Sequence, residues 1–451
     1  MSQQYSQVKT DFGTGPVLKC IVAQALPLTL AQFAHLLYNV VDRIYLGHME
    51  HVGSMALTGV GLSFPIVTLI LAFTSLFGVG GVPLFSLSRG AGDEQKASRI
   101  LGTSFALLCS SSLVMMLLGY LFCRPILFAF GAGEQSYVYA RDYLYILLIG
   151  TPFSMLTTGL NGYINAQGFA KTGMLTTVLG SVVNILLDPI FIFTLDMGVK
   201  GAALATIISQ AISAIWVLHF LTGKRALIPL GKGNISLNPA IIKDILRVGA
   251  ANFVMQGTNC LVQVVCNSTL QRYGGDLYIS IMTVLSSVRE VFMLPVMGLS
   301  GGAQPVIGFN YGAGKNDRVK KGIRVNALLG AGYTLIIWLL VMAFPRFWFG
   351  IFSDDAALVS TGAGAIRIYF CGLIFMAFQS AGQSTFQALA DAKHAITFAL
   401  LRKAIVLVPL ALILPGLGFG VNGVFMAEPI SDVVGGLVCF TVMMKTVYKK
   451  L

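Results

Sequence analysis

Hydrophobic side chains occur along this 451-residue chain in long runs that are separated by short polar segments. Most runs approach or exceed the roughly 20 residues that a helix needs to cross the hydrocarbon core of a bilayer. The pattern therefore predicts an all-α integral membrane protein with twelve transmembrane helices. The predicted spans are 17–42, 54–86, 101–122, 137–163, 172–194, 201–222, 240–270, 278–309, 325–347, 361–389, 395–415 and 421–444.

The composition supports a membrane protein. Hydrophobic residues make up 56% of the chain, charged residues make up 11%, and the mean hydropathy is +0.79. Soluble domains carry roughly 25% charged residues. The polar start, Met1–Lys19, lacks the features of a signal peptide, so we expect the first apolar run to be the first span. The seven cysteines include no C-x-x-C pair, so we interpret them as small buried apolar residues rather than zinc ligands or disulfides.

The net charge of +12 is concentrated in the short loops between apolar runs, which argues against a nucleic-acid partner. With twelve spans, 22 lysines and arginines fall on the face that carries both termini and 7 on the opposite face. Cytoplasmic loops are enriched in these residues, so both termini are predicted to be cytoplasmic in a multi-pass protein of the cell membrane. This assignment places Arg402 and Lys403 at the cytoplasmic face and leaves Arg289 as the one base inside a span.

The two halves of the sequence repeat each other. S-R-G-A-G-D-E-Q-K-A at 88–97 aligns with N-Y-G-A-G-K-N-D-R-V at 310–319, a shift of 222 residues. G-V-K-G-A-A at 198–203 aligns with G-V-N-G-V-F at 420–425 at the same shift. A constant shift predicts two six-helix lobes related by a pseudo-two-fold axis along the membrane normal, as in transporters that bind substrate between repeats. The predicted divisions are an N-lobe at 1–222, a cytoplasmic linker at 223–238 and a C-lobe at 239–451.

Two acids lie within apolar runs of the first half. Asn184 and Asp188 are four residues apart, so they share one face of a helix, and Pro189 then removes a backbone donor. Asp42 ends the first run, with Tyr38 one turn earlier. Ionisable groups at membrane depth usually mark an ion or substrate path. The alternative is a structural pair of polar side chains, but two acids without an adjacent base make a poor structural pair.

The second half has charges of its own. Arg289 and Glu290 lie in the eighth span, and Glu428 and Asp432 share a face of the twelfth. One interpretation is a structural ion pair between Arg289 and an acid of the twelfth span. The other is that three acids against one arginine leave a surplus of negative charge, which would favour a cationic substrate.

The stretch G-G-A-Q-P-V-I-G-F-N-Y-G-A-G-K at 301–315, the parallel repeat and the G-A-G turns resemble the multidrug and toxic compound extrusion (MATE) family over essentially the whole chain. The resemblance implies a secondary antiporter that exports cationic or amphipathic organic compounds in exchange for Na⁺ or H⁺. It implies no enzymatic activity and no cofactor other than the coupling ion. We expect small-molecule substrates, a lipid bilayer environment and a monomer.

The resemblance also implies site residues. A cation site in the first lobe would consist of Asp42, Asn184, Asp188, Thr206, Tyr38 and Asn161, with Pro27 as a bend in the first helix. Carboxylate, amide and hydroxyl oxygens suit a hard cation such as Na⁺, and two close carboxylates can also retain a proton, so both ions remain open. One branch of the family carries acids at second-lobe positions that are Gln256, Gln379 and Gln383 here, which places the chain nearer the DinF-like branch. The substrate-cavity candidates are Arg289, Glu290, Gln256, Gln379, Gln383, Glu428 and Asp432.

Three other functions fit less well. A lipid-linked precursor flippase of the same wider superfamily usually has extra bases lining its cavity, whereas Arg289 is the only clear intramembrane base predicted here. A membrane enzyme would need a metal-binding spacing, a G-x-S-x-G motif or a long soluble loop, and the sequence has none of these. A channel fits a parallel repeat with one off-axis acid pocket poorly.

Overall fold

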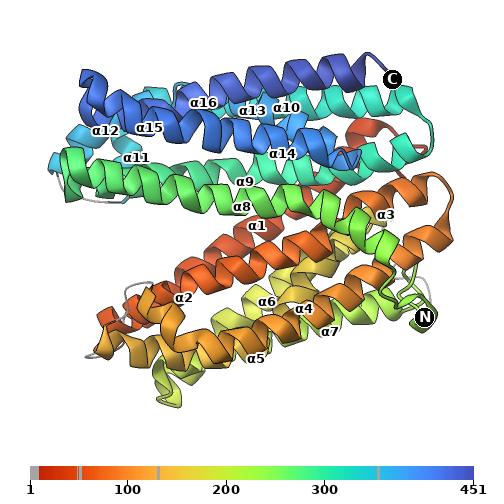
Figure 1. Cartoon of the computed structure of the whole chain (residues 1–451), viewed down its shortest axis with the longest axis horizontal. Helices are drawn as coiled ribbons and strands as arrows, with labels where there is room; N and C mark the ends of the chain where they lie inside the picture. Colours follow the sequence, from red (N-terminus) through yellow and green to blue (C-terminus); the bar gives the residue numbers. More distant parts are fainter. Residues whose placement is uncertain (1–9, 48, 50–52, 130–132, 353–355) are drawn as a thin grey trace. The chain divides into compact units, whose positions relative to one another are not determined.

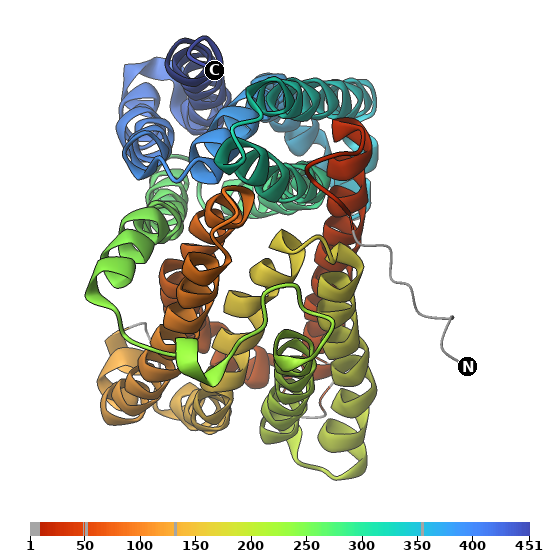
Figure 2. The same ribbon diagram turned by 90° about the vertical axis from the view of Figure 1, so that its right-hand side faces the viewer.

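The protein is helical throughout the part that the computed structural model describes, which is residues 10–47, 49, 53–129, 133–352 and 356–451. No strand occurs in those residues. Figure 1 shows long helices lying side by side, and Figure 2 shows many of them nearly end-on. Helices dominate because lipid offers no water to backbone N–H and C=O groups, which must then be satisfied within the segment. The predicted all-α membrane fold is confirmed.

The chain forms two compact units. Unit 1 comprises 10–11 and Pro27–Gly249, and unit 2 comprises Phe12–Leu26 and Ala250–Leu451. Two helices, α1 (Val17–Gly47) and α8 (Pro239–Gly274), contribute residues to both units. The remaining helices of unit 1 are α2 (Gly53–Thr74), α3 (Gly81–Gly90), α4 (Glu94–Ala129), α5 (Glu134–Ala166), α6 (Ala170–Pro189) and α7 (Gly198–Thr222). Those of unit 2 are α9 (Asp276–Gly312), α10 (Asn316–Ala343), α11 (Pro345–Gly350), α12 (Ala356–Phe370), α13 (Leu373–Ala388), α14 (Ala392–Leu400), α15 (Val408–Leu414) and α16 (Gly420–Met443).

Several helices continue into π-helical turns, which in proteins are frequent at functional sites. One of them, Ile190–Thr194, directly follows Asp188 and Pro189, where proline has no N–H to continue the α-helical bonding. Another, Leu401–Leu407, contains Arg402 and Lys403. The others are Ser75–Val79, Pro415–Phe419 and Met444–Tyr448.

The backbone preserves the internal repeat. Residues with positive φ recur in pairs that are 222 positions apart, in keeping with the shift of the sequence motifs. Asp196 and Ala390 adopt this conformation although it is strained for residues with a Cβ, and their partners at the same shift are glycines. The pairs are Gly92 and Gly314, Gly168 and Ala390, Asp196 and Gly418, and Gly198 and Gly420. The turns between helices are therefore duplicated together with the helices.

Within the described residues, nine helices are long and apolar enough to cross a membrane, or ten if a pair bent by 42° counts as one span. Six of them lie in the first half and coincide with the six spans predicted there. In the second half, α8 does not reach the required hydropathy because polar side chains interrupt it. The stretch Ala392–Tyr448 counts once, although its 57 residues would make a helix of about 85 Å and the backbone turns at Gly418, where φ is 98°. The count of twelve stays a prediction.

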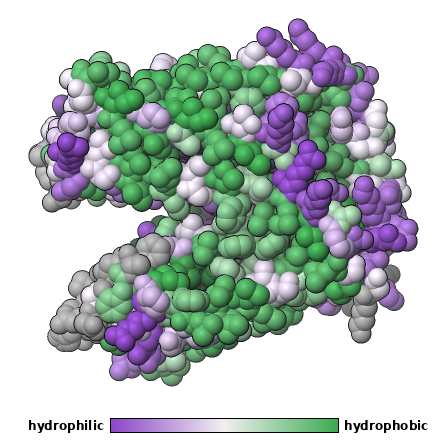
Figure 3. Space-filling view, in the orientation of Figure 1, coloured by the Kyte–Doolittle hydropathy of each residue, from purple (hydrophilic) through white to green (hydrophobic). Residues whose placement is uncertain are grey.

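Each unit has its own hydrophobic core. The larger core of unit 1 includes Leu108, Leu144 and Tyr163, and a smaller one lies around Leu46 and Tyr143. One core of unit 2 gathers Phe349, Phe370 and Phe425, and the other gathers Phe12, Ile21 and Phe386. On the face shown in Figure 3, hydrophobic side chains cover most of the length of the unit 2 helices, and hydrophilic ones gather at their ends. Four of the seven cysteines are buried, but Cys260 and Cys371 are exposed, contrary to the prediction for these two, and none forms a disulfide.

Candidate functional site

Helix α6 places an amide and a carboxylate together in the interior of unit 1. Asn184 and Asp188 are both 0% exposed. The Asn184 amide is assigned so that its nitrogen donates to Asp188 Oδ2 (3.0 Å) and its oxygen accepts from the backbone N–H of Thr206 (3.3 Å). The opposite orientation would set the amide oxygen against the carboxylate. Asn184 thus connects Asp188 to α7.

Helix α1 contributes the second acid. Its Tyr38 side chain hydrogen-bonds to Thr206, and Asp42 follows one turn later, with 8% of its surface exposed. Asp42 and Asp188 lie close enough to interact electrostatically with each other and with Tyr38. Three separate helices, α1, α6 and α7, therefore bring Asp42, Asn184, Asp188, Thr206 and Tyr38 together. We call these five residues the first-unit acid site.

The two carboxylates of this site have no counter-charge bonded to them. Within the described residues, neither Asp42 nor Asp188 forms an ion pair with a lysine, arginine or histidine. Asp42 Oδ1 is a buried acceptor without a hydrogen-bond partner. Such an acceptor costs free energy unless a cation or proton satisfies it. The donor set of carboxylate, amide and hydroxyl oxygens fits a hard monovalent cation, and a bound proton would satisfy it equally well.

The structure does not bring Asn161 to this site through any described bond. The Asn161 side chain, on α5, donates from Nδ2 to the carbonyl oxygen of Gly173 (3.1 Å). Gly173 precedes Asn184 by eleven residues on α6, which is about 16 Å along a helix. The predicted bend residue, Pro27, lies inside α1 at the position where the helix passes from unit 2 to unit 1.

Unit 2 contains a different assembly of charges. Arg289 Nη2 lies 2.8 Å from Asp432 Oδ2 and 3.2 Å from Glu428 Oε1. Arg402 Nη1 donates to Asp432 Oδ1 (3.0 Å), and Lys403 Nζ donates to Glu428 Oε1 (3.1 Å). Arg289 also lies over the ring of Tyr369, 5.5 Å from its centre. We call Arg289, Arg402, Lys403, Glu428 and Asp432 the second-unit ion cluster.

This cluster corrects the charge balance expected from the sequence. The predicted ion pair between Arg289 and the acids of the last helix is present. However, Arg402 is buried, and both it and Lys403 pair with those acids, so the cluster holds three bases and two acids. Glu290, the third acid of the prediction, is exposed and outside the cluster. The expected surplus of negative charge is therefore wrong, because the π-helical segment Leu401–Leu407 turns two bases into the bundle.

The three glutamines that the sequence predicts for the substrate cavity occupy separate places in unit 2. Gln256 is half-buried on α8. Gln383 donates from Nε2 to the carbonyl oxygen of Ala395 (3.0 Å). Gln379 is buried, and its Oε1 has no hydrogen-bond partner. Their side chains take no part in the bonds described for the second-unit ion cluster.

Comparison with known proteins decides the family. The sequence profile of the MatE family matches residues 27–190 and 253–413, which is more than half of the chain. The chain belongs to the MatE family. The multidrug export protein MepA of Staphylococcus aureus (strain N315) is 24% identical over 422 residues, covering 93% of this chain and 92% of MepA. A crystal structure of MATE in complex with MaL6 superposes with a TM-score of 0.92, at 24% identity, over 98% of this chain and 100% of that one. A structure of MATE in the bent conformation gives 0.91 at 25% identity, over 97% of each chain.

Membership confirms the predicted family and the class of protein. MATE proteins are multidrug efflux transporters, so this chain is a multi-pass membrane transporter and not an enzyme. The described residues contain no group of three or more His, Cys, Asp or Glu side chains that could hold a metal ion. The assignment to the DinF-like branch stays a prediction.

Sequence reasoning missed three residues of this MATE protein. Tyr143 on α5 is buried and lies close enough to interact electrostatically with Asp42, Tyr38 and Asp188. It is one of several tyrosines in the same region, and nothing in the pattern distinguishes it. The sequence pattern places Arg402 and Lys403 at the cytoplasmic face, because paired bases at an apolar run usually mark its cytoplasmic end.

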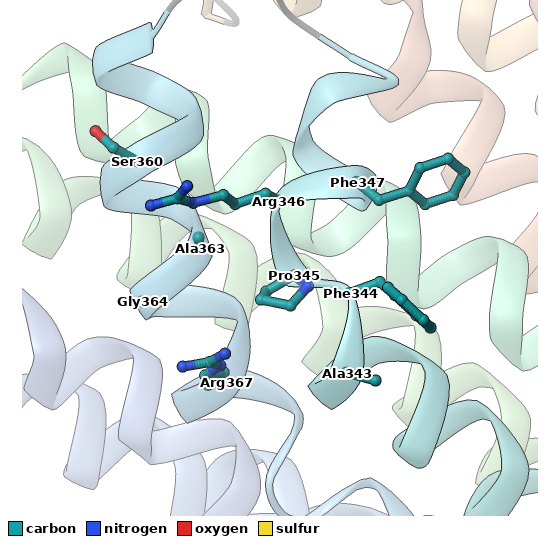
Figure 4. A pocket seen from close by; sticks show the side chains of 9 residues that line it. All are labelled: Ala343, Phe344, Pro345, Arg346, Phe347, Ser360, Ala363, Gly364 and Arg367. Carbon is teal, nitrogen blue, oxygen red and sulfur yellow. The ribbon is translucent and has the colours of Figure 1, made fainter.

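The surface of unit 2 also has a pocket of about 490 Å³ at α11 and α12 (Figure 4). The side chains of Arg346 and Arg367 extend on one side, and Phe344 and Phe347 point the other way. None of the predicted site residues of this MATE protein lines the pocket.

Proposed function

We propose that this MATE protein is a secondary active antiporter that exports organic compounds in exchange for H⁺ or Na⁺. The observation that supports this most directly is the pair of buried carboxylates, Asp42 and Asp188, without a bonded base. A buried acid pair that is not neutralised by the protein is poorly suited to a structural role, but it can bind and release a cation.

The coupling ion is transported cargo, and either ion is consistent with the donor set. Na⁺ would take oxygen ligands from Asp42, Asn184, Asp188 and Thr206. A proton would be shared by the two acids, which then titrate as one unit. Because both ions would use the same carboxylates, we expect each to compete with the other.

The exported compounds are expected to be amphipathic. MepA, which is similar over nearly the whole chain, is named a multidrug export protein. The preference for a cationic substrate that the sequence suggests depends on a negative surplus in unit 2, and the second-unit ion cluster has a positive surplus. A substrate with both an apolar body and charged groups suits this arrangement better.

Helix α1 offers a way to connect ion binding with movement. It carries both Pro27 and Asp42, fifteen residues and about 22 Å apart. Proline leaves the carbonyl of Ala23 without its intrahelical partner, which permits a bend. We expect the occupied acid site to favour one bend of α1, since a ligand shifts a conformational equilibrium only by binding one state better. A similar MATE protein has been crystallised in a conformation described as bent.

Flux through the purified protein in proteoliposomes tests the function. An imposed H⁺ or Na⁺ gradient should drive accumulation of an amphipathic cationic dye such as tetramethylrhodamine methyl ester. Asp42→Asn should abolish gradient-driven accumulation, and Asp42→Asn/Asp188→Asn should be no worse, because the acids act as one unit. Asp142→Asn is the matched control, because Asp142 is an acid of the same unit that is paired with Arg141 and Lys200 and takes no part in the bonds of this site. Gradient-driven accumulation by Asp42→Asn at the wild-type rate would contradict the proposal.

The proposal also includes the membrane location, the topology and the oligomeric state of the protein. We place the protein in the cell membrane with both termini in the cytoplasm, which is supported by the excess of basic residues on that face. We expect a functional monomer, because one chain supplies every residue of the first-unit acid site.

A lipid-linked precursor flippase is the alternative function. It is favoured by Arg402 and Lys403, which add two bases to the interior of unit 2. Two acids already pair with these bases, so we rank it second. Translocation of a fluorescent diphosphate lipid without any ion gradient would support the flippase instead.

A further inference from the structure

We propose that the second-unit ion cluster binds one negatively charged group, supplied by the carboxylate of a transported compound or by a free halide ion. This inference rests on the proposed transport function and adds a recognition site to it. The three bases and two acids of the cluster leave one formal positive charge without a protein partner. Within the described residues, no further acid forms an ion pair with these bases.

The cluster is buried, so water does not compensate this charge well. Asp432 is 0% exposed and the Glu428 side chain 5%, whereas the side chains of Arg289 and Lys403 keep 10% and 15%. A charge in such surroundings needs a partner of opposite sign, because desolvation is costly. The acids are therefore enclosed, and the remaining access to the cluster is through its bases.

One hydrogen-bond donor of the cluster, Arg289 Nη1, has no acceptor, and it indicates where the anion would bind. Arg289 Nη2 contacts Asp432 and Glu428, but Nη1 is buried and has no hydrogen-bond partner. A guanidinium presents its N–H groups in a plane that matches a carboxylate. The Tyr369 ring lies beside this guanidinium, and Nη1 is the donor without a partner, so we expect the anion at Nη1.

The backbone of the segment Leu401–Leu407 places two consecutive bases beside the same acid. Neighbouring residues of an α-helix point about 100° apart. In the π-helical segment Leu401–Leu407, Arg402 and Lys403 are neighbours, yet both lie within 4 Å of Glu428 Oε1, at 3.8 and 3.1 Å. Gly435 on α16 makes room for Arg402, since a Cβ there would lie 2.9 Å from Arg402 Cγ. Two bases would already neutralise the two acids of the cluster, so an electrically neutral network would not require a third base.

Two dyes that differ in a single group test the proposal. Tetramethylrhodamine carries a carboxylate and is zwitterionic, whereas its methyl ester has the same ring system and is a cation. Lys403→Met removes the excess charge, so transport of the zwitterion relative to the ester should fall by at least about tenfold, as expected when a buried charge partner is lost. Glu428→Gln raises the excess positive charge of the cluster from one to two and should lower the KM for the zwitterion.

The combined variant and a matched control complete the test. Lys403→Met/Glu428→Gln restores one excess positive charge and should restore the ratio between the two dyes. Lys393→Met makes the same substitution at an exposed position on α14 and should leave the ratio unchanged. A ratio that does not respond to Lys403→Met or Glu428→Gln would overturn the proposal and leave the cluster a structural network.

A measurement on the unchanged protein covers variants that fail to fold. At constant ionic strength, chloride should raise the thermal unfolding temperature of the purified protein relative to gluconate if a halide occupies the cluster. Stabilisation by the zwitterionic dye but not by chloride would assign the site to the substrate carboxylate. No stabilisation by either would overturn the proposal.

The same experiments separate this inference from the proposed function. If the wild-type protein moves neither dye under any gradient, the transport function itself fails. If it moves the ester under a gradient and Asp42→Asn stops it, the function holds, and only the dye ratio judges the anion site.

Discussion

The first-unit acid site and the second-unit ion cluster share a pair of corresponding helices, α7 and α16, but carry opposite charge balances. Thr206 on α7 and Glu428 on α16 are 222 residues apart, the same shift that relates the duplicated turns. The first site has two acids and no paired base, whereas the second has two acids and three bases. The duplication thus placed polar groups at equivalent positions of α7 and α16, and the two copies carry different chemistry.

The difference shows how to interpret a buried acid in this fold. An acid that is held by two bases, as Asp432 is by Arg289 and Arg402, has its charge compensated within the protein. An acid that has no base, such as Asp188, would under the proposed function be compensated by an ion that can leave. Burial is the same for both, since each is 0% exposed, so the bonded partners distinguish them.

The largest expected effect is on the free energy of unfolding, and it should differ between substitutions of Asp432 and Asp188. Asp432→Asn leaves two buried arginines underpaired, so the free energy of unfolding should fall by about 3–5 kcal/mol. Asp188→Asn frees no base and relieves repulsion from Asp42, so stability should stay within about 1 kcal/mol. Thermal unfolding of the purified proteins in detergent measures both. Equal losses would mean that the two acids have the same structural role.

The next effect is on cation affinity and tests the composition of the first site. Asn184→Ala removes the amide that donates to Asp188 Oδ2, a bond to a charged group worth about 1.5–3 kcal/mol. The cation concentration for half-maximal export should rise by about ten- to a hundredfold. Asn161→Ala is the matched control, because Asn161 bonds a neutral carbonyl at Gly173 and should leave that concentration unchanged. A similar shift in both variants would show that Asn161 belongs to the site.

The smallest effect concerns coupling through α1. Pro27→Ala restores an intrahelical hydrogen bond at the point where α1 passes from one unit to the other. Cation affinity should be retained while export per ion falls by about five- to thirtyfold, a coupling free energy of about 1–2 kcal/mol. Simultaneous measurement of ion and dye flux gives this ratio. An unchanged ratio would indicate a static bend, with the units moving as rigid bodies.

The sequence pointed to the five residues of the first-unit acid site, because polar side chains inside apolar runs are conspicuous. Asp42 and Asp188 are acids inside apolar runs, and Asn184 stands one turn from Asp188 on the same face. It did less well in unit 2, where Arg402 and Lys403 look like the basic end of a span. Whether such a base leaves or enters the bundle depends on a local change of helix type and on Gly435 of another helix, which no local pattern reveals.

The sequence alone determined that this chain is an all-helical membrane protein, that its halves are duplicated and that acids lie within its first half. These properties follow from hydrophobic run length, from the constant shift of 222 and from the cost of a charge in an apolar run. Only the tertiary structure decided which charges meet. It brought α1, α6 and α7 together around two unpaired acids and joined three bases to the acids of α16. The physical reason is that an ion pair depends on distances of a few ångströms between separate helices, and such distances are set by packing rather than by the pattern within any one helix.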